Sequence, residues 1–291
     1  MRRRDFLALS AAAPALAAGR LPVRKGILMG MLPKNLSYAE RCKLAREAGF
    51  EELEVGTIED PAEAAEIGKA AEAAGLRIHS VMNQAHWKYP LSSADPAVVE
   101  RSIKGMETSF ENARVWGADV VLLVPAVVNA ETGYREAWER SQRQIRRLLP
   151  LAEKHKIVIA VENVWNRFLL SPLEFARYVD EFQSPWVRAY FDVGNVVLFG
   201  FPEDWIRTLG HRIVRVHFKD FRFRKRVAEF VNLGEGDVNW PAVHRALAEI
   251  GYKGPATLEL PGGDAEYLKD LSRRMDRILE GGQNVSGGAA A

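Results

Sequence analysis

The sequence is poor in cysteine and in net charge, and each shortage excludes a class of protein. Cys42 is the single cysteine among 291 residues, so no internal disulfide can form and folding does not depend on an oxidising compartment. The 40 basic and 38 acidic side chains give a net charge of +2. Nucleic-acid-binding proteins usually carry a strongly basic surface. We therefore expect no nucleic-acid partner.

Long apolar runs are also missing, and so is a glycine-rich turn after the first predicted strand. The alanine-rich stretch near the N-terminus is too short to span a membrane as a helix. After the first predicted strand the chain reads GMLPKNLS (30–37). A glycine-rich phosphate turn at that point is the usual mark of a doubly wound sheet that binds dinucleotides. The sequence therefore does not favour that class of enzyme.

The first nineteen residues have the pattern of a targeting segment and are kept out of the fold. Residues 1–19 place three arginines before an alanine-rich run, and Ala15-Leu16-Ala17 offers small residues at a cleavage site. Arg3-Arg4-Asp5-Phe6-Leu7 resembles a twin-arginine export signal, with Arg2 where Ser or Thr usually stands. This resemblance implies export of the folded protein to the periplasm, with no membrane anchoring after signal removal. A disordered basic N-terminus is the alternative.

Short apolar runs alternate with helical patterns between residues 24 and 281. The eight apolar runs span residues 26–30, 52–55, 77–82, 119–125, 157–163, 187–195, 214–220 and 255–260. Eight strand–helix pairs over about 250 residues predict an α/β fold, a (β/α)8 TIM barrel. No internal linker is evident, so we expect a single domain, with a doubly wound open sheet as the structural alternative. Residues 282–291 read as a flexible tail.

The segments between the strands carry local signals for helices and for one hairpin. Ser37 and Asp60 fit N-cap positions, and Pro61 fits the first turn of the second helix. Residues 221–231 alternate apolar and charged side chains. This alternation predicts a hairpin lid over the barrel, followed by a tight turn in the Gly234-Glu235-Gly236-Asp237 stretch.

Acidic or imidazole side chains end four of the predicted strands. Glu162, Asp192, His217 and Glu259 each follow apolar residues, and the active site of a (β/α)8 barrel lies at the carboxyl ends of its strands. Burying several carboxylates together is costly unless a cation offsets their charge. Three carboxylates and one imidazole suit Mn²⁺, Mg²⁺ or Co²⁺, and Zn²⁺ is also compatible. A core histidine, buried ion pairs and a turn cap at Asp192 are the alternatives.

Other polar and aromatic residues near the strand ends are predicted substrate contacts. His79 and His86 lie on or just after the third strand, and Trp165 lies in a mouth loop. Strand alternation places Lys219 on the same side as His217. The alternatives are a core histidine at His79, ordinary packing at Trp165, and an ion pair between Lys219 and a glutamate.

The strand-end motifs resemble those of the xylose isomerase-like TIM barrels. That family includes sugar isomerases, ketose 3-epimerases and hydroxypyruvate isomerase. The resemblance covers nearly all of the chain after the N-terminal segment. The motifs are Val161-Glu162-Asn163, Phe191-Asp192-Val193-Gly194-Asn195, Val216-His217-Phe218-Lys219-Asp220, Gly234-Glu235-Gly236-Asp237 and Leu258-Glu259-Leu260.

The resemblance implies a metal ion and two acid/base groups. By analogy with the ketose epimerases, Glu162, Asp192, His217 and Glu259 would hold one divalent ion. Mn²⁺ is the preferred ion, with Mg²⁺, Co²⁺ or Zn²⁺ as alternatives. Glu162 and Glu259 would exchange protons with opposite faces of the substrate, through an enediolate that the metal stabilises.

The loop after the fifth strand also resembles the epimerase loop that ends in Asn-Arg-Phe. Its residues Asn163, Trp165 and Arg167 are predicted substrate contacts. The loop carries one extra residue after the glutamate, and no acid follows Phe168. Asn195 stands where many sugar-acting members have a histidine. It can hydrogen-bond a substrate hydroxyl but cannot act as an acid or base at neutral pH.

These features predict a metal-dependent sugar isomerase or epimerase that acts on a small carbohydrate. A metal-dependent lyase acting on an oxidised (3-keto) glycoside is the first alternative, and a non-catalytic sugar-binding barrel is the second. Endonuclease IV shares the predicted fold but needs three zinc ions, and too few of the six histidines fall at the mouth. A homo-oligomer is compatible with the sequence, which has no feature that decides the point.

Overall fold

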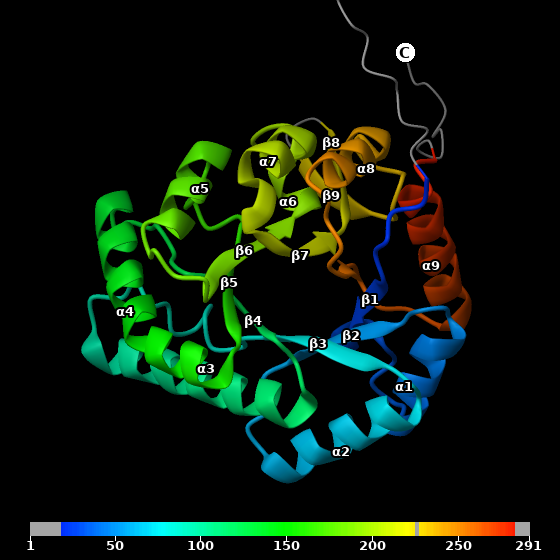
Figure 1. Ribbon diagram of the computed structural model, residues 1–291, viewed down its shortest axis with the longest axis horizontal. Coiled ribbons are helices and arrows are strands. Elements are labelled where there is room, and N and C mark those ends of the chain that lie inside the picture. The colour runs from blue at the N-terminus through cyan, green and yellow to red at the C-terminus, as the bar shows by residue number, and fades with distance from the viewer. Residues whose placement is uncertain (1–18, 225–226, 283–291) are drawn as a thin grey trace, which may run out of the picture.

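Eight parallel strands form a closed barrel at the centre of the protein (Figure 1). The structure is a computed structural model that describes residues 19–224 and 227–282. Around the barrel the strands follow the order β1-β10-β7-β6-β5-β4-β3-β2. Their bounds are β1 Lys25–Leu28, β2 Glu52–Gly56, β3 Arg77–Met82, β4 Val120–Leu123, β5 Val158–Glu162, β6 Val187–Asp192, β7 Ile213–Phe218 and β10 Ala256–Leu258. The predicted (β/α)8 barrel is confirmed, and the open doubly wound sheet is excluded.

Helices surround the barrel and cover the outer face of its strands (Figure 1). Ser37 and Asp60 cap the first two long helices as predicted, each accepting a hydrogen bond from a backbone N–H of the first turn. The α-helices are α1 Tyr38–Glu47, α2 Pro61–Ala73, α3 Pro96–Trp116, α4 Tyr134–His155, α5 Pro172–Asp180, α6 Val193–Val196, α7 Pro202–Leu209, α8 Trp240–Glu249 and α9 Ala265–Leu279. The described residues also form two 3₁₀ turns, η1 Met29–Met31 and η2 Gly210–Arg212.

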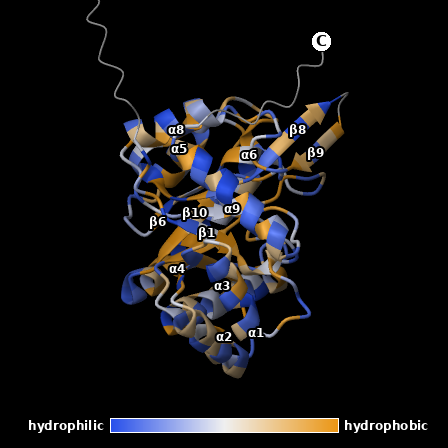
Figure 2. Ribbon diagram, turned by 90° about the vertical axis from the view of Figure 1, so that its right-hand side faces the viewer, coloured by the Kyte–Doolittle hydropathy of each residue, from blue (hydrophilic) through white to orange (hydrophobic). Residues whose placement is uncertain are grey.

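The interior of the barrel differs in character from the layer between strands and helices. Apolar side chains fill that outer layer, which is why the strands are the most hydrophobic part of the ribbon in Figure 2. Inside the barrel the apolar cluster is small, made by Val120, Leu122, Ala160 and Tyr190. Other interior positions hold buried polar side chains, among them Glu54, His79 and Thr257. Glu54 contacts His217 near the carboxyl ends of the strands.

The sixth strand ends at Asp192, as the pattern of strand-end residues predicted, and the short helix α6 follows at once. The remaining residues of the run 187–195 therefore lie outside the strand. The carboxylate of Asp192 accepts a hydrogen bond from the backbone N–H of Asn195 at 2.8 Å. Because this cap turns the chain, residues 193–195 leave the strand direction at the level of the site.

A two-stranded hairpin projects from the mouth end of the barrel (Figure 2). Its strands are β8 Asp220–Arg224 and β9 Val227–Val231, which confirms the predicted hairpin. Asp220 fixes its base, since this fully buried carboxylate accepts hydrogen bonds from Gly234 N and Trp240 Nε1, both at 2.8 Å. Gly234 takes a positive φ of 84°, as the predicted tight turn requires.

Replacing Asp220 by Ala is expected to lower the free energy of unfolding by about 3 kcal/mol. The substitution leaves at least two buried N–H donors without an acceptor, and each such donor costs about 1–3 kcal/mol. Urea unfolding followed by circular dichroism measures the effect. Asp237→Ala is the matched control on the same turn, because Asp237 is exposed and should cost less than about 1 kcal/mol. Equal losses in the two variants would contradict the role given to Asp220.

Both ends of the chain lie largely outside the described residues. The predicted signal segment 1–19 falls there except for Gly19, as does the predicted tail 282–291 except for Gly282. Within residues 19–224 and 227–282, no helix is both long and apolar enough to cross a membrane. Export, periplasmic location and oligomer formation remain predictions.

Candidate functional site

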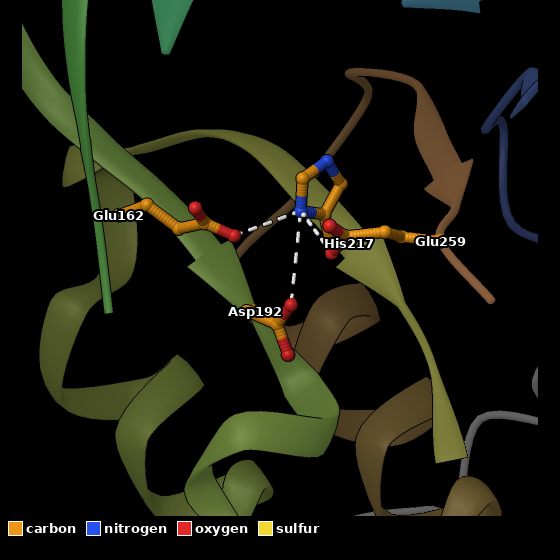
Figure 3. Close-up of side chains that lie close together, drawn as sticks. All are labelled: Glu162, Asp192, His217 and Glu259. Atoms are coloured by element: carbon orange, nitrogen blue, oxygen red, sulfur yellow. Dashed lines mark hydrogen bonds and ion pairs between the residues drawn. The ribbon is translucent and has the colours of Figure 1, made fainter. Parts of the chain in front are cut away.

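Four side chains that were predicted from separate strand ends meet at the mouth of the barrel (Figure 3). Glu162, Asp192, His217 and Glu259 each offer an atom within 4.8 Å of the others. The Nδ1 atom of His217 lies at the centre of the group. It is 2.9 Å from a Glu162 oxygen, 3.0 Å from a Glu259 oxygen and 3.7 Å from an Asp192 oxygen. One imidazole nitrogen and three carboxylates thus face a common point.

The parallel register of the barrel brings these residues together. Asp192 is directly opposite His217 across β6 and β7, and both end or nearly end their strands. Glu162 is the last residue of β5, the next strand around the barrel. Glu259 directly follows β10, on the other side of β7. Since adjacent parallel strands end at one edge, four strands present their side chains to one place.

The donor set of this site fits a divalent cation. The Oδ2 atom of Asp192 and the Oε2 atom of Glu259 are buried and have no hydrogen-bond partner among the described residues. Both lie near the ammonium of Lys219, but only as ion pairs. Oxygen ligands with one imidazole match the preference of Mn²⁺, Mg²⁺ and Co²⁺, and do not exclude Zn²⁺. The four residues present therefore fit the group that the sequence predicts.

Lys219 lies beside the acidic cluster. Its Nζ atom is 2.9 Å from Asp192 Oδ2 and 2.7 Å from Glu259 Oε2. Burial lowers the pKa of Lys219, but the charges of Asp192 and Glu259 outweigh burial and raise it well above the ordinary value. The backbone of Lys219 is crowded by Gly194, where a Cβ atom would stand 2.8 Å from the Lys219 carbonyl oxygen. Glycine at position 194 therefore lets α6 approach β7 closely enough to seat the lysine.

The pKa values of the two candidate acid/base groups are shifted in opposite directions. Burial raises the pKa of Glu162 to about 7, although the hydrogen bond from His217 opposes the shift. Burial also acts to raise the pKa of Glu259, but His217 and Lys219 outweigh it and hold that pKa well below the usual range. Two carboxylates with opposite shifts at one site are typical of a pair with distinct acid and base roles.

The acidic neighbours of His217 favour the charged form of its imidazole. Burial lowers the pKa of His217, but the negative charges of Glu259 and Glu54 outweigh burial and raise the pKa well above its usual value. A protonated imidazole then offsets part of the negative charge of the cluster. Binding of a cation through Nδ1 would displace the proton on that atom, so metal affinity should rise with pH.

A cavity of about 260 Å³ opens onto this cluster. The lining residues are Met82, His86, Trp87, Glu162, Val164, Trp165, Asn195, Lys219 and Glu259. A larger hollow of about 1070 Å³ lies between α4 and α5 and contains none of the candidate site residues. We place the site in the smaller cavity, because the titratable groups with perturbed pKa values line it.

Aromatic side chains form one wall of this cavity. Trp165 stacks on Phe230 of the hairpin, with ring planes 12° apart and centroids separated by 5.5 Å. The indole N–H of Trp165 donates to the carbonyl of Asn195 at 3.0 Å. On the loop after β3, Nδ1 of His86 accepts a hydrogen bond from Val124 N, and burial lowers the pKa of His86 to about 4. His86 is therefore neutral at physiological pH.

Three predicted substrate contacts are not among the residues that line this cavity. His79 lies inside the barrel, not at its mouth, where its ring bonds Arg215 Nε and Thr257 Oγ1 at 3.2 and 2.9 Å. The pairing register between β2 and β3 shifts at His79. Such a shift cannot be read from the sequence, so the depth of His79 in the barrel could not be predicted. Asn163 uses both ends of its amide on the backbone of Asp192. Arg167 is exposed, outside the lining of the cavity.

The sequence analysis missed Glu54. This β2 residue is fully buried, and its Oε1 atom is 2.9 Å from Nε2 of His217. Its other oxygen accepts hydrogen bonds from Tyr190 OH and Ser80 Oγ. The signal was present in the run ELEV, where two acids alternate with apolar residues in a strand expected to be buried on both faces.

Curated relatives of this chain are sugar-phosphate epimerases. L-ribulose-5-phosphate 3-epimerase UlaE of Escherichia coli O1:K1 is 26% identical over 253 residues, which cover 83% of this chain and 88% of that protein. The UlaE of Salmonella paratyphi C matches over the same length with the same identity. The chain thus spans most of the length of these proteins.

Solved structures share the fold at lower identity. D-psicose 3-epimerase in the presence of D-fructose superposes with a TM-score of 0.73 at 18% identity, covering 89% of this chain and all of that chain. The apo form of 3-keto-D-glucoside 4-epimerase YcjR from E. coli superposes with a TM-score of 0.74 at 15% identity, covering 88% and 99%. Similarity at 15–18% sequence identity shows a shared fold.

The relatives and the fold agree on one assignment. Residues 42–278 match the profile of the xylose isomerase-like TIM barrels. This match spans well over half of the chain, and the curated relatives that align with it are named epimerases. The protein is therefore an enzyme, and it belongs to the xylose isomerase-like TIM barrel family.

Proposed function

We propose that this enzyme is a divalent-metal-dependent epimerase or isomerase of small sugars, which moves a proton at a carbon next to a carbonyl. The observation that carries the proposal is the convergence of Glu162 and Glu259 on one point, together with Asp192 and His217. These four residues would hold the ion. When bound, a divalent ion supplies positive charge that favours the loss of a proton next to a carbonyl.

The protein residues supply the proton transfers. One of the two carboxylates, Glu162 or Glu259, takes the proton from carbon, and the electron pair of the C–H bond moves into the neighbouring carbonyl. The other carboxylate returns a proton to the opposite face, so the carbon inverts and no atom is gained or lost. Lys219 holds the Glu259 carboxylate in place by an ion pair at 2.7 Å. Two bases on opposite faces are what inversion requires.

The lining of the cavity favours an unphosphorylated sugar. Among the described lining residues, Lys219 is the one lysine or arginine, and it already pairs with Asp192 and Glu259. A phosphate group needs cationic or multiple N–H donors, and the cavity offers mainly indole rings, a neutral imidazole and an amide. Trp87 and Trp165 present apolar faces of the kind on which sugar rings pack. The predicted export agrees with this preference.

Incubation with sugars in heavy water tests the proposal. We expect the Mn²⁺-loaded enzyme to convert at least one ketopentose or ketohexose to its epimer, with one deuterium at the reacting carbon, by nuclear magnetic resonance. A panel that includes 5-phosphorylated ketoses and 3-keto-glycosides separates the alternatives. Release of an aglycone from a 3-keto-glycoside would favour a lyase instead. Saturable sugar binding without any deuterium uptake would contradict proton transfer at a carbon next to the carbonyl.

A further inference from the structure

Inside the barrel, the carboxylate of Glu54 links the imidazole of His217 to side chains from distant parts of the barrel wall. It lies on β2, and its partners come from β3, β6 and β7. Glu54 Oε1 is 2.9 Å from His217 Nε2, and Glu54 Oε2 accepts from the Tyr190 hydroxyl at 2.7 Å and from Ser80 Oγ. The residue has no exposed surface. Every contact of this carboxylate is thus made inside the barrel.

The two nitrogens of His217 face different groups. Nδ1 faces Glu162, Asp192 and Glu259, which is the side where an ion would bind. Among the described residues, Glu54 is the one polar contact of Nε2. An imidazole nitrogen that coordinates a metal must present a lone pair, so the ring proton has to reside on the other nitrogen. A carboxylate that accepts a hydrogen bond from Nε2–H favours this arrangement.

Burial of the Glu54 carboxylate costs free energy that its few partners must offset. In the described part of the chain, Glu54 has no lysine or arginine partner, and His217 is its one ion-pair contact. A carboxylate buried in this way costs several kcal/mol unless hydrogen bonds and a nearby positive charge offset it. Ser80 and Tyr190 supply two hydrogen bonds, and the imidazole supplies the third. A metal-bound histidine that donates its other N–H to a carboxylate is a recurrent arrangement in metalloproteins.

We propose that Glu54 is a positioning residue, which fixes the ring orientation and the Nε2–H tautomer of His217 and thereby sets the metal affinity of the site. The inference rests on the proposed metal-dependent function. Tyr190 and Ser80 would hold the Glu54 carboxylate in turn. Glu54 itself touches neither the ion nor the sugar in this scheme.

Metal affinity of matched variants tests this role. We expect Mn²⁺ titration followed by electron paramagnetic resonance to show about 10-fold weaker binding for Glu54→Gln and about 100-fold weaker binding for Glu54→Ala. Gln keeps an acceptor for Nε2–H, whereas Ala removes it. Glu52→Gln is the control, because Glu52 is a buried glutamate on the same strand that pairs with Arg24 and Arg77 instead. Its Mn²⁺ affinity should stay within about 3-fold of the parent.

The tautomer gives a second readout, which a purely structural role would not change. In ¹⁵N-histidine-labelled, Zn²⁺-loaded enzyme, a protected Nε2–H signal of His217 is expected, assigned by its loss in His217→Ala. The signal should persist in Glu54→Gln and disappear in Glu54→Ala. If the Ala variant does not fold, Glu54→Gln and Tyr190→Phe carry the test, since Tyr190→Phe removes one support of the carboxylate.

The outcomes separate this inference from the proposed function. Parent enzyme that binds Mn²⁺ tightly, with unchanged affinity in both Glu54 variants, would overturn the positioning role and leave the metal-dependent function intact. An equal loss in Glu52→Gln would also overturn it, because the effect would then be general destabilisation. Parent enzyme that binds no Mn²⁺ at millimolar concentration would overturn both proposals.

Discussion

Replacing Glu162 by Gln is expected to lower kcat/KM for epimerisation by about 10³-fold. Positioned proton transfer contributes about 10²–10⁴-fold, and a neutral amide can neither take nor give a proton at working pH. Gln keeps the size of the side chain and one oxygen that can face an ion. The bound metal and the free energy of unfolding should therefore change much less than the rate. Steady-state kinetics with the substrate found in heavy water measures the loss.

The two glutamates can be distinguished by partial reactions. If Glu162 and Glu259 serve opposite faces, each single Gln variant retains the base that acts on one epimer. Glu162→Gln should then exchange deuterium into one epimer without forming the other, and Glu259→Gln should do the reverse. Exchange of the same epimer in both variants would contradict the two-base assignment.

A surface carboxylate serves as the control for these variants. Glu153 lies exposed on α4, away from the barrel mouth, and Glu153→Gln should retain the parental rate. Retention of more than about a tenth of parental kcat/KM by Glu162→Gln would exclude Glu162 as an essential acid or base. The single glutamate that remained essential would then point to a one-base reaction.

Removing the imidazole of His217 is expected to abolish metal binding. Three carboxylates face His217 Nδ1 within 3.7 Å, so His217→Ala deletes the central donor and leaves those acids buried close together. We expect about one equivalent of Mn, Co, Mg or Zn in the parent enzyme and less than about 0.1 equivalent in the variant. The affinity loss should be at least about 10²-fold, larger than for a residue outside the ligand set. Plasma mass spectrometry after dialysis measures the content.

Two control measurements are needed to interpret the metal content of His217→Ala. His211 is exposed on η2 outside the barrel, so His211→Ala should retain the full metal content. Circular dichroism should show that His217→Ala is folded. Loss of metal from an unfolded variant would say nothing about His217 as a ligand. A parent enzyme with three zinc ions would revive the nuclease alternative. A folded His217→Ala variant with undiminished metal would exclude His217 as a ligand.

The pattern of the sequence determined the architecture and the main members of the site. Eight apolar runs separated by capped helices leave few folds open, because parallel strands buried on both faces need continuous apolar sequence. Glu162, Asp192, His217 and Glu259 could be predicted as neighbours, since strand ends of a parallel barrel meet at one edge. The hairpin of β8 and β9 followed from its local alternation of apolar and charged residues.

Only the tertiary structure decided which polar side chains line the cavity at the barrel mouth and which lie deeper inside the barrel. His79 and Glu54 are both polar residues within barrel strands, but His79 bonds interior groups while Glu54 supports His217. A register shift between β2 and β3 separates them, and such shifts depend on packing against other strands. The hydrogen bonds between Asn163 and the backbone of Asp192 also depend on tertiary structure, because they join the loop after β5 to the end of β6.

The sequence by itself thus fixes the order of strands and helices and the residues at the strand ends, because these depend on local periodicity. Depth within the barrel, the pairing of Lys219 with Asp192 and Glu259, and the contact of Glu54 with His217 depend on residues 27 to 163 positions apart. Long-range contacts of this kind arise when the barrel closes. The residues at the strand ends supply the chemical groups of the site. Closure of the barrel brings those groups together with their charged neighbours and thereby determines the electrostatic balance of the site.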